Sequence, residues 1–433
     1  MTEDIKILIE NESSVLDDFR ARILTNHPMA SFKLSLRTTD DNKRKFQSQA
    51  TFKSDNNGVI DLNTQAPISG NYTSVDSNGL FWSMSSHDNK EQMFIKQTSA
   101  PLTFIMEVYS DSDRLLKVFT FTRCFLLKDI EILPVNETIV GTLYYPKNKT
   151  SLPAIVLLGG SDGSVHESSA ALLATQGYAV LALAYFGKKG LPKGIENIPL
   201  EYVERSFNFL ESKSFVNNKK FGIIGHSRGS ELALLYASKH SRIRSVIAVA
   251  PSAIVFSGML NFQATSQPAW TYKGEPFRFY TPERSFKDTV SFFRHLILKK
   301  PFSNIEKMKQ IINDEDKLKP FKIPIQEIQA PIMFISGTDD HVQPAELFVK
   351  QMQHTLRDHK YSENNKFLFY KGAGHFSAFP ANLSNLPQTL GTTNFNMTMI
   401  FGGTKENNAK AAQQTWAETI RFLKTTLANS HKS

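Results

Sequence analysis

The chain has 433 residues, more than one compact core usually supports, so its length favours two domains. With 41% hydrophobic and 21% charged residues, its composition is that of a folded globular protein and argues against disorder. Lys and Arg exceed Asp and Glu by 50 to 41, a formal net charge of +9. Such an excess either serves solubility or attracts an acidic ligand, and the charge alone does not decide between them.

Several other classes of protein are disfavoured. The single cysteine, Cys124, excludes an intramolecular disulfide. Residues 1–10 include acids and no long apolar run, so we expect no secretory signal, and no window approaches the roughly 20 apolar residues of a membrane span. The basic runs at 43–45 and 188–193 are not interleaved with aromatics, so no nucleic-acid surface is expected. We therefore expect a soluble, cytoplasmic protein without a membrane span.

The first part of the chain, residues 1–130, is predicted to be a small β-sandwich. Long helical periodicity is missing there, and turn-forming residues at 55–58 (Asp-Asn-Asn-Gly) and 69–71 (Ser-Gly-Asn) separate short alternating segments. The predicted strands lie at 5–9, 32–36, 49–52 and 104–108.

From about residue 139 the pattern changes to nearly continuous apolar strands that alternate with helices. The predicted strands lie at 139–145, 154–158, 178–185, 221–225, 245–250, 331–336 and 366–370. The predicted helices lie at 168–175, 200–210, 231–238 and 411–427. Uninterrupted apolar strands in such an alternation indicate a mostly parallel sheet covered by helices on both faces, so residues 131–433 are predicted to form an α/β domain.

An insertion at about 252–325 interrupts this alternation. It is rich in aromatic residues and contains Pro268, Pro276 and Pro282. Two interpretations remain open: a packed insertion that completes the core, or a cap over the site that is lined for an apolar group.

A catalytic serine is predicted at Ser227. Residues 225–229 (Gly-His-Ser-Arg-Gly) fit G-x-S-x-G, directly after the strand at 221–225 and directly before a helical pattern. A nucleophile on this sharp turn projects above the sheet, and the glycines permit close approach of the backbone. The following helix directs N–H dipoles at the negative charge that develops during attack. The alternative is a glycine-flanked turn in an ordinary strand–helix unit.

The base and the acid should follow the serine in the chain. His375 lies in the loop 372–376 after the strand at 366–370, and we predict it to be the general base. The preceding strand leads into Asp339 and Asp340. Asp340 lies three residues beyond Gly337, the usual offset of the acid, and is favoured to orient His375 and stabilise its imidazolium form.

Two backbone donors are predicted to form an oxyanion hole. One is the N–H of Arg228, and the other comes from the glycine-rich loop 159–163, for which Ser161 is the candidate. The loop matches neither a phosphate-binding P-loop nor G-x-G-x-x-G. No histidine–carboxylate spacing indicates a metal site, so neither a metal nor a separate cofactor is expected.

Over nearly its whole length the sequence resembles the acyl-CoA thioesterase and bile acid-CoA:amino acid N-acyltransferase family. The matching strings in the first part lie at 58–62 (GVIDL), 70–72 (GNY) and 79–84 (GLFWSM). In the second part they lie at 141–143 (GTL), 181–185 (LALAY), 191–193 (LPK), 200–202 (LEY), 229–232 (GSEL) and 337–341 (GTDDH).

The resemblance implies an immunoglobulin-like domain followed by an α/β-hydrolase domain, with a nucleophile–Asp–His triad that acts on CoA thioesters. The triad falls on Ser227, Asp340 and His375. Family members that conjugate acyl groups to amino acids tend to use cysteine as nucleophile, so serine favours hydrolysis of a small-molecule acyl-CoA, with CoA as part of the substrate. His226 and Arg228 beside the serine depart from the family pattern.

Three other functions remain open: an acyl-CoA:amino acid N-acyltransferase, a carboxylesterase or lactone hydrolase that does not use CoA, and an inert hydrolase-fold binding protein. Lys188, Lys189 and Lys193 are candidates to meet the CoA phosphates, against the alternative of a solvated loop.

Overall fold

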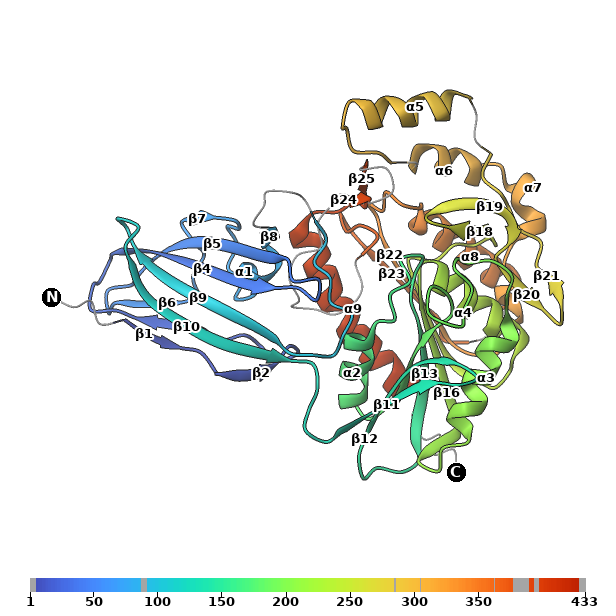
Figure 1. The fold of residues 1–433 in the computed structure, drawn as a ribbon, viewed down its shortest axis with the longest axis horizontal. Helices are drawn as coiled ribbons and strands as arrows, with labels where there is room; N and C mark the ends of the chain where they lie inside the picture. Colours follow the sequence, from blue (N-terminus) through green and yellow to red (C-terminus); the bar gives the residue numbers. More distant parts are fainter. Residues whose placement is uncertain are drawn as a thin grey trace.

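A computed structural model describes residues 5–86, 92–283, 286–303, 305–361, 363–376, 389–392 and 397–427. Two parts are visible in Figure 1: an elongated part built of strands, which contains the N-terminus, and a larger part in which helices cover a central sheet. Within the described ranges, no helix is both long enough and apolar enough to pass through a bilayer.

The N-terminal part is a β-sandwich of two sheets. The smaller sheet has the order β1 (Lys6–Leu8), β3 (Arg22–Leu24), β6 (Val59–Asp61). The larger has the order β2 (Glu12–Ser14), β10 (Leu115–Cys124), β9 (Leu102–Ser110), β4 (Ser31–Thr39), β5 (Lys45–Lys53), β7 (Ser69–Gly70), and β8 (Ser85–Ser86) also pairs with β5. Buried and exposed residues alternate along β4 and β5 because one face of this sheet meets the core and the other meets solvent. The short helix α1 (Gly79–Trp82) contributes Phe81, whose ring packs edge-on against Phe19 at 4.7 Å and Phe104 at 5.0 Å.

The larger part is built on an eight-stranded sheet. Its order is β11 (Ile130–Asn136), β12 (Val140–Pro146), β14 (Ala179–Ala184), β13 (Leu152–Leu158), β16 (Val216–His226), β17 (Ile243–Val249), β22 (Ile332–Gly337), β23 (Lys366–Tyr370). The pairs β11–β12 and β12–β14 are antiparallel, and every pair from β14 to β23 is parallel. The predicted mostly parallel sheet is therefore confirmed.

Helices cover both faces of this sheet, which is why its central strands are buried throughout. The helices α2 (Glu167–Thr175) and α9 (Lys405–Thr426) share one hydrophobic cluster with the sandwich. The helices α3 (Leu200–Glu211), α4 (Arg228–Lys239) and α8 (Ala345–Asp358) belong to the cluster on the other face. Lys405 at the start of α9 donates to the carbonyl oxygen of Met84 over 2.9 Å, so polar contacts also join the two parts.

The insertion divides into two halves that pack differently. The first half contains β18 (Ser257–Leu260), β19 (Gln263–Pro268), β20 (Trp270–Tyr272) and β21 (Glu275–Pro276), and β20 also pairs with β15 (Ile198–Pro199). Trp270 there is fully buried in the core that contains α4, so this half does complete the core. The second half contains α5 (Phe286–Ile297), α6 (Ile305–Ile312), α7 (Glu315–Leu318) and the short 3-10 helices η1 (Lys319–Phe321) and η2 (Ile325–Glu327). Near α6 lies the hairpin of β24 (Thr389–Thr392) and β25 (Met397–Ile400), and α5 projects beyond both (Figure 1).

Several elements differ from the sequence prediction; no helix was predicted at α8 and no strand at β10, for example. Strand β11 was not predicted, because it lies at the edge of the sheet and mixes Glu131 and Pro134 with apolar residues. Helix α9 begins six residues before the predicted start at 411, where the apolar spacing is absent. Thr404 caps this polar first turn, and its hydroxyl oxygen accepts a hydrogen bond from the N–H of Asn407 over 3.1 Å.

Candidate active site

Ser227 lies on a strained turn between β16 and α4. Its backbone dihedrals are φ 53° and ψ −118°, a combination that costs energy for any residue with a Cβ. The flanking glycines are required by close contacts: a Cβ on Gly225 would lie 2.1 Å from the carbonyl oxygen of Gly229, and a Cβ on Gly229 would lie 2.2 Å from that of Gly159. The turn is held in place where Ser227 N–H donates to the carbonyl oxygen of Val249 over 2.8 Å.

His375 follows β23 and contacts the serine directly. Its Nε2 lies 3.0 Å from Ser227 Oγ, although the two residues are 148 positions apart in the sequence. The loop that holds the ring is fixed on both sides, because Gly374 N–H donates to Asn408 Oδ1 over 2.7 Å and His375 N–H donates to the carbonyl oxygen of Phe401 over 3.0 Å. Ser227 and His375 are both buried, which excludes most water from the contact between them.

Asp340 follows β22 and completes a chain of polar contacts. Its Oδ2 lies 2.8 Å from His375 Nδ1. Its Oδ1 accepts hydrogen bonds from the backbone N–H groups of Val342, over 2.8 Å, and Gln343, over 3.1 Å. With a carboxylate as acceptor, Nδ1 carries the proton, which leaves the lone pair of Nε2 free to accept the hydroxyl proton of Ser227.

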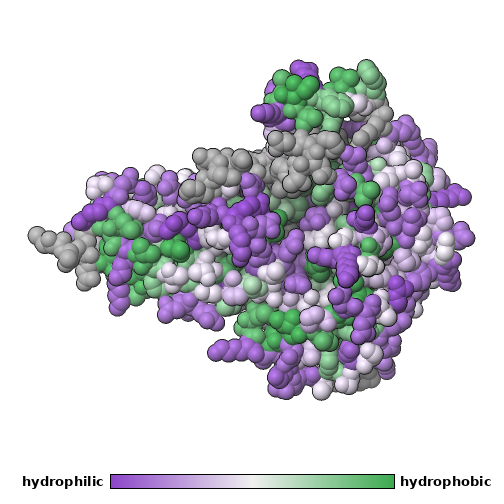
Figure 2. Space-filling view, viewed as in Figure 1, coloured by the Kyte–Doolittle hydropathy of each residue, from purple (hydrophilic) through white to green (hydrophobic). Residues whose placement is uncertain are grey.

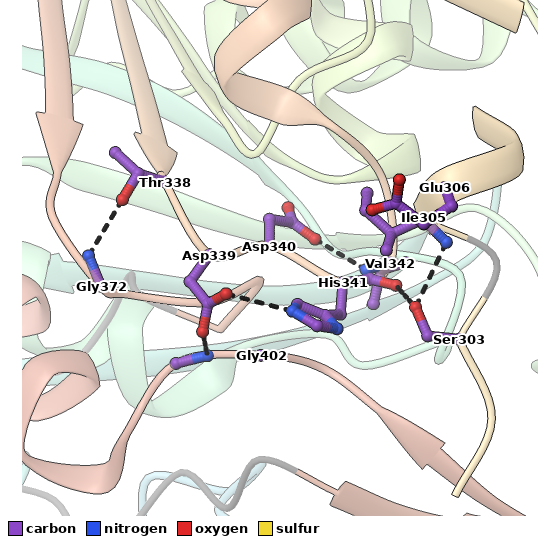
Figure 3. Close-up of polar contacts among 12 residues, drawn as sticks. Ser303, Ile305, Glu306, Thr338, Asp339, Asp340, His341, Val342, Gly372 and Gly402 are labelled. Atoms are coloured by element: carbon purple, nitrogen blue, oxygen red, sulfur yellow. Dashed lines mark hydrogen bonds and ion pairs between the residues drawn. The ribbon is translucent and has the colours of Figure 1, made fainter. Parts of the chain in front are cut away.

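The neighbouring Asp339 makes a different set of contacts, as Figure 3 shows. Its Oδ1 lies 3.0 Å from His341 Nε2, and its Oδ2 accepts a hydrogen bond from Gly403 N–H over 2.9 Å. The side chain of Asp339 is half exposed, whereas that of Asp340 is buried. Of the two aspartates, Asp340 alone is within hydrogen-bond reach of His375, and Asp339 joins its loop to the segment at 403.

The glycine-rich loop after β13 passes beside the serine. A Cβ on Gly160 would lie 3.4 Å from Ser227 Cβ, so any side chain at this position would be in contact with Ser227. Ser161 is half-buried in this loop. Arg228 is the first residue of α4, and an N–H at that position has no acceptor within its own helix. The oxyanion roles of Ser161 and Arg228 stay predictions.

A buried ion pair directly behind the serine was missed by the sequence analysis. Arg228 Nη1 donates to Glu231 Oε2 over 2.6 Å, and Glu231 Oε1 accepts from Trp270 Nε1 over 2.6 Å and from Phe256 N–H over 3.1 Å. Arg228 Nη2 donates to the carbonyl oxygen of Ser257 over 2.9 Å. We call Arg228, Glu231 and Trp270 the elbow cluster. The signal that could have revealed it is a pair of opposite charges three residues apart in a helix whose other positions are mostly apolar.

Burial raises the pKa of Glu231 to about 7, against the opposing effects of the Arg228 charge and the hydrogen bonds from Trp270 and Phe256. The elbow cluster thus joins the first turn of α4 to β20 of the insertion. The joining group is the carboxyl of Glu231, which with a pKa of about 7 is about half protonated near neutral pH.

A second histidine lies near His375. His226, next to Ser227 in the sequence, places its Nε2 3.2 Å from the carbonyl oxygen of His375. Burial holds the pKa of His226 well below its usual value, and the nearby His375 and His166 lower it further. A neutral ring with its proton on Nε2 donates to that carbonyl without adding a positive charge beside His375.

The sheet order, the turn between β16 and α4, and the sequential positions of Ser227, Asp340 and His375 are those of an α/β hydrolase. The sequence profile described as "BAAT / Acyl-CoA thioester hydrolase C terminal" matches residues 198–429, and the one described as "Acyl-CoA thioester hydrolase/BAAT N-terminal region" matches residues 18–137. The chain belongs to this acyl-CoA thioester hydrolase/BAAT family, and the resemblance described from the sequence is confirmed.

Relatives within the family have more than one activity in their names. Acyl-coenzyme A thioesterase 1 of Homo sapiens is 27% identical over 91% of this chain and 89% of its own length. Peroxisomal succinyl-coenzyme A thioesterase of Mus musculus is 26% identical over 90% of this chain and 89% of its own length. Acyl-coenzyme A amino acid N-acyltransferase 1 of Mus musculus is 26% identical over 98% of this chain and 99% of its own length.

Proposed function

We propose that this protein is an acyl-CoA thioesterase that hydrolyses a CoA thioester to a free acid and CoA through an acyl-serine intermediate. The observation that carries the proposal is the contact chain from Ser227 Oγ through the ring of His375 to Asp340, with distances of 3.0 Å and 2.8 Å. The family supports the substrate class, and the serine nucleophile supports hydrolysis over transfer to an amine.

In the first half-reaction, His375 Nε2 takes the proton of Ser227 as Oγ attacks the thioester carbonyl carbon. The N–H groups of Arg228 and Ser161 stabilise the oxyanion, and the N-terminus of α4 adds its dipole. The tetrahedral intermediate collapses with cleavage of the C–S bond, and the proton on His375 passes to the sulfur, so CoA leaves as a thiol.

In the second half-reaction, His375 takes a proton from water, which attacks the acyl-serine carbonyl. Collapse of this intermediate releases the carboxylic acid and returns the proton to Ser227. Asp340 stabilises the imidazolium form of His375 in both steps. The reaction uses no metal and no cofactor other than the CoA of the substrate.

The exposed lysines at 188, 189 and 193 are candidates to meet the CoA phosphates. They lie in the loop after β14, and Phe186 of that loop is within 3.6 Å of the Cβ position of Gly163 in the glycine-rich loop. Positive charge at this mouth of the site would attract an anionic substrate.

The test is to measure thiol release and acid formation from short-, medium- and long-chain acyl-CoAs, with and without glycine or taurine, by wild type and Ser227→Ala. We expect free acid as the product and a rate loss on the order of 10⁶-fold in Ser227→Ala. Labelling with a fluorophosphonate probe, expected in wild type and absent in Ser227→Ala, reports whether the serine is activated.

Each other function predicts a different result. An amide product would identify an N-acyltransferase, the activity named for one relative. Labelled protein that turns over simple esters but no thioester would be a carboxylesterase or lactone hydrolase. Protein that neither labels nor turns over any of these substrates would be an inert binding protein.

A further inference from the structure

Helix α5 has an apolar face that the described part of the molecule does not cover. Phe286, Val290, Phe293 and Ile297 recur at the spacing that places residues along one side of a helix. Phe286 is 84% exposed, Ile297 77% and Phe293 53%. No described residue of α5 is buried, so this helix does not use its apolar residues for the core as α3 and α4 do.

Basic side chains border this apolar face. Arg294, Lys299 and Lys300 are exposed at the C-terminal end of the helix. From Phe286 to Lys300 the sequence has four Lys and Arg residues and one Asp, a net charge of 4 − 1 = +3. Glu283 and Glu306, which lie before and after the helix in the sequence, pair with Lys317 and Lys309.

The position of the helix makes this face accessible. Figure 2 shows apolar side chains gathered on α5, which projects from the molecule, with hydrophilic side chains beside them. A groove of about 540 Å³ along the helix is lined by apolar Phe286, Val290 and Leu298 together with Arg294, His295 and Lys300. Apolar residues with a basic border suit an anionic amphiphile, in which negative headgroups surround hydrocarbon.

A second copy of the chain fits this face poorly. A helix of 12 residues is about 18 Å long and provides one narrow ridge, whereas a stable interface buries about 1,200–2,000 Å². Two copies would also bring their positive charges together. An anionic bilayer has neither difficulty, because it accepts a single helix lying in its surface and attracts the basic residues.

The segment after α5 connects this helix to the catalytic loops. Phe302 N–H donates to the carbonyl oxygen of Thr398, a residue of β25, over 2.8 Å. Ser303 Oγ donates to the carbonyl oxygen of His341 over 2.9 Å, one residue beyond Asp340 (Figure 3). The segment that follows α5 is therefore hydrogen-bonded to the loop that contains Asp340.

We propose that α5 docks the protein onto an anionic lipid surface, with Phe286, Val290, Phe293 and Ile297 at the acyl boundary and Arg294, Lys299 and Lys300 among the headgroups. This interaction is independent of the proposed thioesterase activity, because it needs no catalytic turnover. It involves a helix that lies on the membrane and does not span it.

Co-sedimentation of the full chain with vesicles tests this proposal. Vesicles of phosphatidylcholine, with and without phosphatidylserine, are compared at low and high salt. We expect binding that depends on phosphatidylserine and weakens with salt. Phe293→Glu with Ile297→Glu should lower partitioning by about tenfold or more, because two charges enter the apolar face. Arg294→Glu with Lys300→Glu should remove the preference for phosphatidylserine.

The matched control is Ile68→Glu with Val75→Glu, two apolar residues of the sandwich with 60% and 54% exposure. This variant should bind vesicles within about twofold of wild type. Thermal unfolding of every variant checks that the fold is kept. The proposal is overturned if wild type does not bind phosphatidylserine vesicles, or if both double variants of α5 bind as wild type does. It is also overturned if wild type is a dimer that the Phe293/Ile297 variant dissociates while vesicle binding is absent.

Discussion

The two halves of the insertion contain similar aromatic residues and use them differently. Trp270 of the first half is fully buried and donates to Glu231, which in turn pairs with Arg228, the residue after Ser227. Phe293 of the second half is 53% exposed on α5. The difference shows that aromatic content does not decide burial. A segment is buried where the rest of the chain offers it an apolar wall and partners for its polar groups, and the elbow cluster offers both.

The largest expected effect of burial and polar contacts is at Asp339 and Asp340. These adjacent aspartates differ in side-chain exposure, and only Asp340 contacts His375. Asp340→Asn should lower kcat by about 10⁴-fold, because an amide would favour the wrong tautomer of His375 and would not stabilise the imidazolium. The half-exposed Asp339→Asn should cost less than about tenfold. Steady-state kinetics with a reactive ester or thioester measures both variants. A larger loss in Asp339→Asn would reverse the assignment of the acid.

A direct test of the two halves replaces one aromatic residue in each. Trp270→Ala should lower the free energy of unfolding by about 3–5 kcal/mol, because it leaves a cavity and removes a donor from Glu231. Phe293→Ala should change it by less than about 0.5 kcal/mol. Chemical denaturation measures both. Equal losses would contradict the difference in packing.

The smallest expected effect is the pH dependence that Glu231 gives to stability. Its pKa of about 7 in the folded state lies above the ordinary value of 4.5, so the folded state binds more protons between these pH values. The contribution of Glu231 to the free energy of unfolding is therefore fully present below about pH 4.5 and is lost as pH rises through 7. The total loss is on the order of 3 kcal/mol. In Glu231→Gln this contribution should be absent.

Denaturation midpoints at several pH values test this point. The difference in unfolding free energy between wild type and Glu231→Gln should become less favourable to wild type as pH rises from 5 to 8. Glu327→Gln is the control, because Glu327 pairs with Lys239 at the protein surface. Parallel pH profiles for wild type and Glu231→Gln would show that the buried carboxyl does not titrate in this range.

The sequence by itself determined the fold class and the chain order of Ser227, Asp340 and His375. Both depend on local signals: continuous apolar strands, the glycines that permit the turn at Ser227, and the loops that follow β22 and β23. Because the carboxyl ends of parallel strands meet at one edge of a sheet, residues far apart in sequence could be predicted to meet. The domain boundary at 130 and the cytoplasmic location stay predictions.

The tertiary structure alone decided which polar groups lie around that site and which apolar groups remain exposed. The pairing of Arg228 with Glu231 and Trp270, and the contact of His226 with the carbonyl of His375, join residues that carry no shared local pattern. The exposed face of α5 has the same 3.6-residue period as a core helix. Periodicity predicts that a helix has an apolar face, but only the arrangement of the other elements determines whether that face is covered.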